Sequence, residues 1–127
     1  MISRAKPLSL LFLFVLISVA TRPAHALSAK DKAAQQAGAL LFRSKGCAHC
    51  HGEAGIGGKK GPVLTALPKD KLWTPAKITD QILNGGQKMP PFSESVTDAE
   101  AAQLVAYLRA KHKPIPPPAP PSAAPAN

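Results

Sequence analysis

The chain has 127 residues, with 16 Lys and Arg against 7 Asp and Glu, so its formal net charge is +9. This length allows one small domain once a leader is removed. Because the chain has only one Trp, one Tyr and four Phe, its moderate basic excess lacks the aromatic and basic pattern of a nucleic-acid-binding protein. Acidic protein surfaces are the partners that this charge favours.

Residues 1–26 have the pattern of a secretory signal peptide. Arg4 and Lys6 precede an apolar run over 8–20, and an Ala-His-Ala sequence ending at Ala26 offers the small residues that signal peptidase requires. The run is shorter than the roughly 20 apolar residues of a membrane-spanning helix, which disfavours the alternative of an uncleaved anchor. We therefore expect a periplasmic or otherwise exported protein of 101 residues, with 13 basic and 7 acidic side chains and no membrane span.

Capping boxes at Ser28 and Thr97 and a Thr-Pro pair at Thr74 mark the starts of three predicted helices. Apolar residues at helical spacing follow each start. The glycine-rich stretch 52–61 and the proline-containing stretch 87–95 are expected to be loops. No segment alternates as a strand should, so the expected fold class is all-α. The helices are expected over residues 28–44, 74–84 and 97–111 of a domain that spans residues 27–113.

A C-x-x-C-H run follows the first helix. Cys47 and Cys50 are the only cysteines, their spacing brings both thiols to one side of a helical turn, and His51 comes next. This pattern attaches a c-type haem, because two thiols add to the vinyl groups of one porphyrin and the imidazole binds iron. A zinc site would need a second ligand pair, a thioredoxin-like site a βαβ pattern, and a disulfide over so short a loop would stabilise little. The predicted cofactor is one haem c with its iron, bound through two thioethers.

The other axial position on the iron has one favoured ligand and two alternatives. Met89 is the only methionine left after cleavage, and it lies in a polar loop with no helical face on which to pack. His112 at the end of the last helix and an open or water-bound position are the alternatives. The backbone of His49, inside the attachment motif, keeps that ring away from the iron. A neutral thioether would favour ferrous iron and exclude small ligands.

With its C-x-x-C-H run, a helix on each side and a late Met-Pro, the chain resembles a class I cytochrome c of the small bacterial type over about residues 33–111. In that family, a helix with Gly-x-x-x-Phe crosses a last helix with a Leu-x-x-Tyr-Leu face. The resemblance implies the cytochrome c fold, with three main helices around one covalent haem and the sixth ligand in the segment of Met89. The matching residues at the crossing are Gly38, Phe42, Leu104, Tyr107 and Leu108.

The resemblance also implies roles around the haem. Gly61-Pro62 is similar to the family's Gly-Pro pair, whose proline carbonyl accepts a hydrogen bond from the ligating imidazole; a simple turn is the alternative. Trp73 would donate its indole N–H to a haem propionate or would pack as a half-buried ring. The residues expected to line the haem faces are Val63, Leu64, Leu67, Ile78, Ile82 and Phe92.

These features predict a soluble monomeric electron carrier without enzymatic chemistry, which exchanges one electron at a time with donor and acceptor proteins. A cytochrome subunit held permanently by a dehydrogenase or oxidase complex is the alternative, and a haem-based sensor or peroxidase would need an open sixth position. Residues 114–127, half of them proline, are expected to form a disordered tail or, alternatively, a docking arm. The lysines expected to form a basic rim that orients the partner, each otherwise an ordinary surface lysine, are Lys45, Lys59, Lys60 and Lys88.

Overall fold

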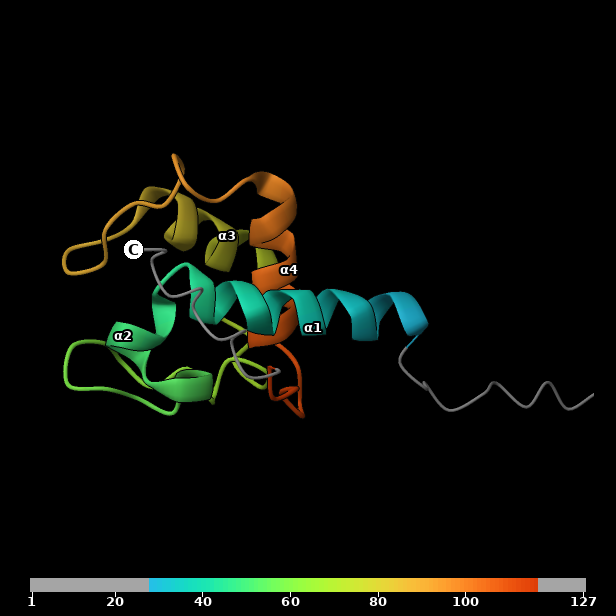
Figure 1. Cartoon of the computed structure of the whole chain (residues 1–127). Coiled ribbons are helices and arrows are strands. Elements are labelled where there is room, and N and C mark those ends of the chain that lie inside the picture. Colours follow the sequence, from blue (N-terminus) through green and yellow to red (C-terminus); the bar gives the residue numbers. More distant parts are fainter. Residues whose placement is uncertain (1–27, 117–127) are drawn as a thin grey trace, which may run out of the picture.

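The computed structural model describes residues 28–116, and within this part the chain is helical and contains no strand (Figure 1). The all-α expectation is therefore confirmed. Among the described helices, none has the length and apolar character needed to span a membrane. The expected signal peptide lies outside the described residues. The helices are α1 (Ala29–Ser44), α2 (Cys47–His51), the 3-10 helix η1 (Glu53–Gly55), α3 (Pro75–Asn84) and α4 (Asp98–Leu108).

The three longer helices begin where the sequence predicts. The Ser28 hydroxyl accepts a hydrogen bond from the Asp31 N–H at 3.2 Å, and the Asp31 carboxylate accepts one from the Ser28 N–H at 3.3 Å. Thr97 and Glu100 form the same reciprocal pair at 3.3 and 2.9 Å. Thr74 caps α3 with its side chain. These caps satisfy backbone N–H groups that a helix start leaves without partners.

Three details differ from the expectation. α4 ends at Leu108 rather than near Lys111, because the next turn tightens and leaves the helix. The stretch 52–61, expected as a loop, contains the short helix η1. Pro116 is buried, although the free tail was expected to begin at residue 114; residues 117–127 lie outside the described part of the chain.

α1 and α4 cross near the middle of α1, and this is the most extensive contact between two helices in the described chain (Figure 1). Gly38 lies at the crossing, where a β-carbon would overlap the carbonyl oxygen of Gln103 and lie 2.7 Å from Cβ of Tyr107. The rings of Phe42 and Tyr107 pack with their centroids 5.5 Å apart. A glycine is required because only its bare backbone lets the two helices approach this closely.

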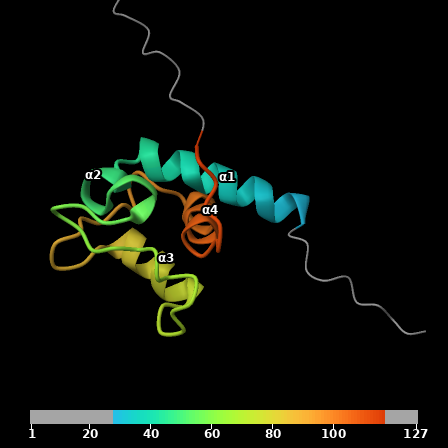
Figure 2. The same cartoon turned by 90° about the horizontal axis from the view of Figure 1, so that it is seen from below.

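α4 lies between α1 and α3, so the core has one helix on each side of a central one (Figure 2). Tyr107 and Leu104 of α4 are fully buried within it. Cys47, Trp73 and Met89 are partly buried and pack against the edge of this core. These three residues, which the sequence analysis assigns to a cofactor site, therefore pack directly against the helical core. The buried apolar residues are Ala39, Phe42, Leu67, Ile78, Ile82, Val96, Ala101, Leu104, Val105, Tyr107, Leu108 and Ala110.

Candidate functional site

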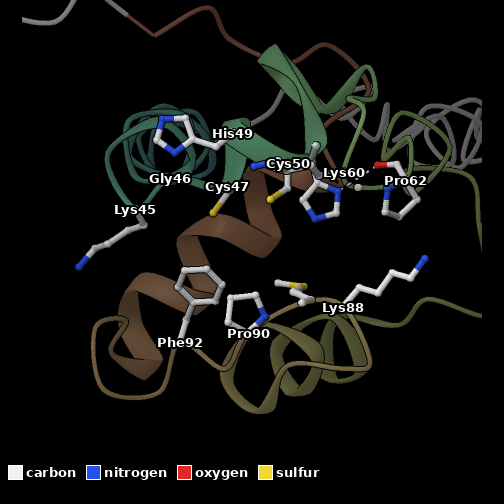
Figure 3. A pocket seen from close by; sticks show the side chains of 13 residues that line it. Lys45, Gly46, Cys47, His49, Cys50, Lys60, Pro62, Lys88, Pro90 and Phe92 are labelled. Atoms are coloured by element: carbon white, nitrogen blue, oxygen red, sulfur yellow. Dashed lines mark hydrogen bonds between the residues drawn. The ribbon is translucent and has the colours of Figure 1, made fainter.

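α2 presents the C-x-x-C-H run at the edge of a cavity. Gly46, with φ at 79°, turns the chain sharply between α1 and α2 in a left-handed conformation that favours glycine. Cys47 and Cys50 are free, half-buried thiols on the same side of the turn, and His49 points away from them (Figure 3). Burial raises the pKa of the Cys47 thiol. The expected arrangement of two adjacent thiols on one turn is present.

Two adjoining cavities, of about 280 and 400 Å³, lie between α2 and the loop that follows α3. His51, Pro62, Lys88 and Met89 line both of them. Figure 3 shows Cys47 and Cys50 on one side of the smaller cavity, with Lys88, Pro90 and Phe92 across from them. Cavities of this size hold small molecules and cofactors.

The His51 ring is oriented by the segment that follows η1. Its Nδ1 lies 2.9 Å from the carbonyl oxygen of Pro62 (Figure 3). A carbonyl oxygen only accepts hydrogen bonds, so the Nδ1 atom must carry the proton that is donated. The other ring nitrogen, Nε2, then keeps its lone pair for a metal. The hydrogen bond expected from Gly61-Pro62 is present, and it selects the tautomer that a metal ligand requires.

Met89 lies on the opposite wall, in a loop tied to the end of α3. The N–H of Gly86 donates to the Met89 carbonyl at 2.8 Å, and the N–H of Phe92 donates to the Ile82 carbonyl at 3.1 Å. Gly85 has a φ of 73°, and a β-carbon there would lie 2.5 Å from the Met89 carbonyl oxygen. His112, the alternative ligand, is exposed and lines neither cavity. The fold thus brings Met89 and His51 to the same space from segments distant in sequence.

The apolar residues expected around the cofactor line these cavities. Phe92 lines the smaller cavity, whereas Val63, which is 57% exposed, lines the larger one. Most of the others are buried or half-buried there, so the wall is largely apolar. The remaining expected residues that line the larger cavity are Leu64, Leu67, Ile78 and Ile82.

Trp73 is half-buried and lines the larger cavity, with the Lys77 ammonium 4.7 Å from its ring centroid. The Arg109 guanidinium donates to the Trp73 carbonyl at 2.6 Å. The same nitrogen also lies within hydrogen-bonding distance of the Leu67 and Asp70 carbonyls, at 3.3 and 3.4 Å. Arg109 directly follows α4, so it ties three carbonyls of the segment 67–73, which lines the larger cavity, to the end of that helix.

Lys45 differs from the other lysines expected at the rim. Its ammonium pairs with Glu100 at 3.1 Å and donates to the Ser95 carbonyl, so it is half-buried and its charge is compensated. Hydrogen bonds from the Thr97 N–H and from Lys45 hold the pKa of the Glu100 carboxyl below its usual value. This pair joins the end of α1 to the start of α4. The rim lysines that stay exposed are Lys59, Lys60 and Lys88.

Gln81 lines the larger cavity and had not been singled out from the sequence. It belongs to α3 and shares a helix face with Ile78 and Ile82, both of which are buried. A polar side chain on an otherwise apolar, buried face is the pattern by which it could have been found, because such a group needs a hydrogen-bond partner. Its partners depend on the loop after α3.

The donors in this site fit a c-type haem. Two thiols on one turn suit attachment to a porphyrin, and an imidazole and a thioether on opposite walls are the axial ligand types of a low-spin iron. The apolar cavity walls suit the faces of a macrocycle. Within the described residues, no group of three or more His, Cys, Asp or Glu side chains is arranged to hold a different metal ion.

Comparisons with known proteins agree with this fit. A family model described as "Cytochrome C oxidase, cbb3-type, subunit III" matches residues 33–108. A comparison with curated protein sequences finds no match. Among solved structures, the chain is similar to dihydro-heme d1 dehydrogenase NirN in complex with DHE, at 32% identity and a TM-score of 0.51. That similarity covers 69% of this chain and 18% of the other.

Two further similar structures are cytochromes. The c-type cytochrome XoxG from Methylobacterium extorquens AM1 is 24% identical, with a TM-score of 0.56, over 66% of this chain and 57% of that one; it supports the fold alone. Cytochrome CL from the marine methylotrophic bacterium Methylophaga aminisulfidivorans MPT is 28% identical, with a TM-score of 0.53, over 62% and 55%. This chain therefore spans between 18% and 57% of the lengths of these three relatives.

Proposed function

The chain belongs to the c-type cytochromes, in the family described as Cytochrome C oxidase, cbb3-type, subunit III, and from this membership we propose that it is a soluble, periplasmic one-electron carrier with a single haem c. Cys47 and Cys50 would hold the haem through two thioethers, and His51 and Met89 would bind its iron. The haem iron supplies a reversible one-electron couple. The protein performs no substrate chemistry.

One observation carries the proposal: His51 and Met89 line the same two cavities, and both thiols line one of these cavities. The bond from His51 to the Pro62 carbonyl fixes the ring and increases the electron donation of its other nitrogen. The loop that carries Met89 is fixed to α3 by backbone hydrogen bonds. A site with both axial positions filled by protein transfers electrons and does not bind small ligands, which supports a carrier over a sensor or peroxidase.

The residues around the iron restrict how the electron enters and leaves. Leu67, Ile78 and Ile82 are buried apolar side chains on the inner wall of the larger cavity, whose rim includes the exposed Val63 and Lys88. The smaller cavity is bordered by the exposed Lys60 and Lys88. We expect exchange with a partner at the thioether side, because a positive surface there would attract an acidic protein.

A second candidate function is that of a cytochrome subunit held permanently in an oxidase or dehydrogenase complex. The family description, which names an oxidase subunit, favours it, as does the similarity to a part of the much longer NirN chain. Gel filtration of a native extract, followed by haem staining, separates the two candidates. A free carrier elutes as a small monomer, whereas a permanent subunit elutes with its complex.

The proposal is tested by replacing both thiols, Cys47→Ala with Cys50→Ala, in a host that matures c-type cytochromes. The unaltered protein is expected to stain for haem on a denaturing gel and to be reduced reversibly by one electron. The double variant is expected to lose the stain and much of its helical circular dichroism, because the apolar cavity walls would then face water. Lys30→Ala, on the exposed start of α1, is the control and should keep its haem. A colourless wild-type protein would refute the proposal.

A further inference from the structure

The side chain of Gln81 reaches from α3 into the larger cavity beside Met89. Its Nε2 atom donates to the Gly85 carbonyl at 2.9 Å and lies 4.0 Å from the Met89 sulfur. Ile78 and Ile82, its neighbours on the same helix face, are buried, so the amide lies in a largely apolar setting. The amide is therefore close to the sulfur that the proposed function assigns to the iron.

The chain leaves space for the amide at this place. A β-carbon on Gly86 would lie 2.6 Å from the Gln81 Nε2 atom, so any larger residue would push the amide away. The Gly86 N–H itself donates to the Met89 carbonyl at 2.8 Å. Gln81, Gly85, Gly86 and Met89 thus form one hydrogen-bonded unit in which the side-chain amide contacts both the backbone and the sulfur.

The chemistry of the two groups allows the contact to act as a hydrogen bond. A primary amide has two N–H donors, and the Gly85 carbonyl takes only one of them. A thioether sulfur is a weak acceptor with two lone pairs, of which a metal uses one. The second N–H of Gln81 and the second lone pair of Met89 are therefore each left available for the other.

We propose that Gln81 is a positioning residue that donates a hydrogen bond to the Met89 sulfur and thereby raises the reduction potential of the iron, an inference that rests on the His/Met ligation proposed above. An N–H directed at the sulfur withdraws electron density from it. The thioether then donates less to the iron, which disfavours the electron-poor ferric state more than the ferrous state. The same bond selects which of the two sulfur lone pairs faces the iron.

The test compares haem-loaded wild-type protein with Gln81→Leu, which has neither an N–H donor nor an atom that binds iron. We expect the variant to keep the far-red ferric absorption band that marks Met–iron bonding in this family. Its ratio of ferrous to ferric protein at a fixed electrode potential should fall by about two- to tenfold, as the loss of one hydrogen bond implies. A tenfold fall corresponds to about 59 mV for a one-electron couple.

Asn84→Leu is the matched control, because Asn84 carries an exposed side-chain amide at the end of the same helix and lines neither cavity. Its potential should stay near that of the wild type. An equal fall in both variants would mean that the loss of any amide on α3 has this effect and would overturn the specific role of Gln81. In the wild-type protein, the side-chain N–H protons of Gln81 should also exchange with solvent more slowly than those of the exposed Gln87, as measured by NMR.

Two other outcomes overturn the proposal in distinguishable ways. If Gln81→Leu keeps both the band and the wild-type potential, the contact with sulfur has no electronic effect. If the variant loses the band, Gln81 acts by holding the loop through the Gly85 carbonyl, and the hydrogen bond to sulfur is not its role. A wild-type protein without the band refutes the ligation itself, and this is seen before any variant is measured.

Discussion

The imidazole of His51 and the thioether of Met89 illustrate how much a single residue's chemistry depends on its neighbours. His51 follows the two cysteines in sequence, but it is the Pro62 carbonyl at 2.9 Å that determines which ring nitrogen carries the proton. Met89 is an ordinary polarizable side chain until a loop tied to α3 turns it towards the same space. His112, an equally competent ligand chemically, lies on the surface and lines neither cavity.

Replacing Met89 tests the ligand assignment. Met89→Ala is expected to keep the covalent haem, to lose the far-red ferric band and to lower the reduction potential, because no thioether remains to favour ferrous iron. Absorption spectra and a redox titration measure these changes. His112→Ala is the control and should match the wild type in both. If the wild type instead lacks the band, and His112→Ala changes the potential whereas Met89→Ala does not, His112 is the ligand.

Among the secondary-structure elements, the crossing of α1 and α4 supports the rest of the described structure. The caps of both helices follow from a few neighbouring residues, whereas their close approach depends on Gly38 meeting the backbone of α4. α2 follows directly from α1, so the geometry of the crossing also determines where the C-x-x-C-H run lies. The ion pair between Lys45 and Glu100 holds the same two helices at the end next to α2.

Gly38→Ala tests the crossing. Alanine has the higher helix propensity, so without the close approach the change would stabilise α1 by about 0.5–1 kcal/mol. Because the new methyl group would overlap the Gln103 carbonyl, we expect a loss of about 1–3 kcal/mol in the free energy of unfolding instead. Denaturant titration of the haem-loaded protein measures it.

The control for this change is Ala33→Gly on the exposed start of the same helix, which should cost about 0.5–1 kcal/mol through propensity alone. The sign of the effect at Gly38 is therefore the deciding observation. A gain in stability for Gly38→Ala would mean that the two helices do not approach as closely as described.

At the scale of the whole protein, the docking of a redox partner depends more on where the charges lie around the site than on the net charge. Lys60 and Lys88 border the smaller cavity and are exposed, and Lys59 is exposed next to Lys60 in sequence. Lys45 is excluded from this group by its pairing with Glu100. A local positive surface at the entrance to a redox site steers an acidic partner, and its influence decays over about 10 Å at an ionic strength of 0.1 M.

Charge reversal at this surface tests the steering. The double variant Lys60→Glu and Lys88→Glu should be oxidised by the anionic oxidant hexacyanoferrate(III) on the order of tenfold more slowly than the wild type at low ionic strength. With a cationic cobalt(III) complex as oxidant, the variant should instead be oxidised faster than the wild type. Stopped-flow measurements over a range of salt concentrations check both, and the differences should shrink as salt increases.

Lys30→Glu with Lys32→Glu is the matched control, since both residues are exposed at the start of α1, which projects beyond α4 in Figure 1. These changes should alter the rates far less. Equal slowing in the two sets of variants would assign the effect to net charge and not to the surface beside the cavity.

The features that could be predicted from the sequence act over a few neighbouring residues: the caps at Ser28, Thr74 and Thr97, the all-α class, and the spacing that puts two thiols and an imidazole on one turn. Such patterns are readable because backbone geometry alone connects their members. The prediction that Met89 is the second iron ligand depends on its being the only methionine after the predicted signal peptide and on the family resemblance.

Only the tertiary structure determined the contacts between segments that meet after the helices pack. The pairing of Lys45 with Glu100 and the clamp of Arg109 on the Trp73 carbonyl join residues far apart in the chain. The position of Gln81 beside the Met89 sulfur depends on how the loop after α3 folds back onto that helix. No local pattern encodes these contacts, since they exist only once the helices have packed. The chemistry of the attachment site was therefore readable from neighbouring residues, whereas the environment that tunes it was determined by packing.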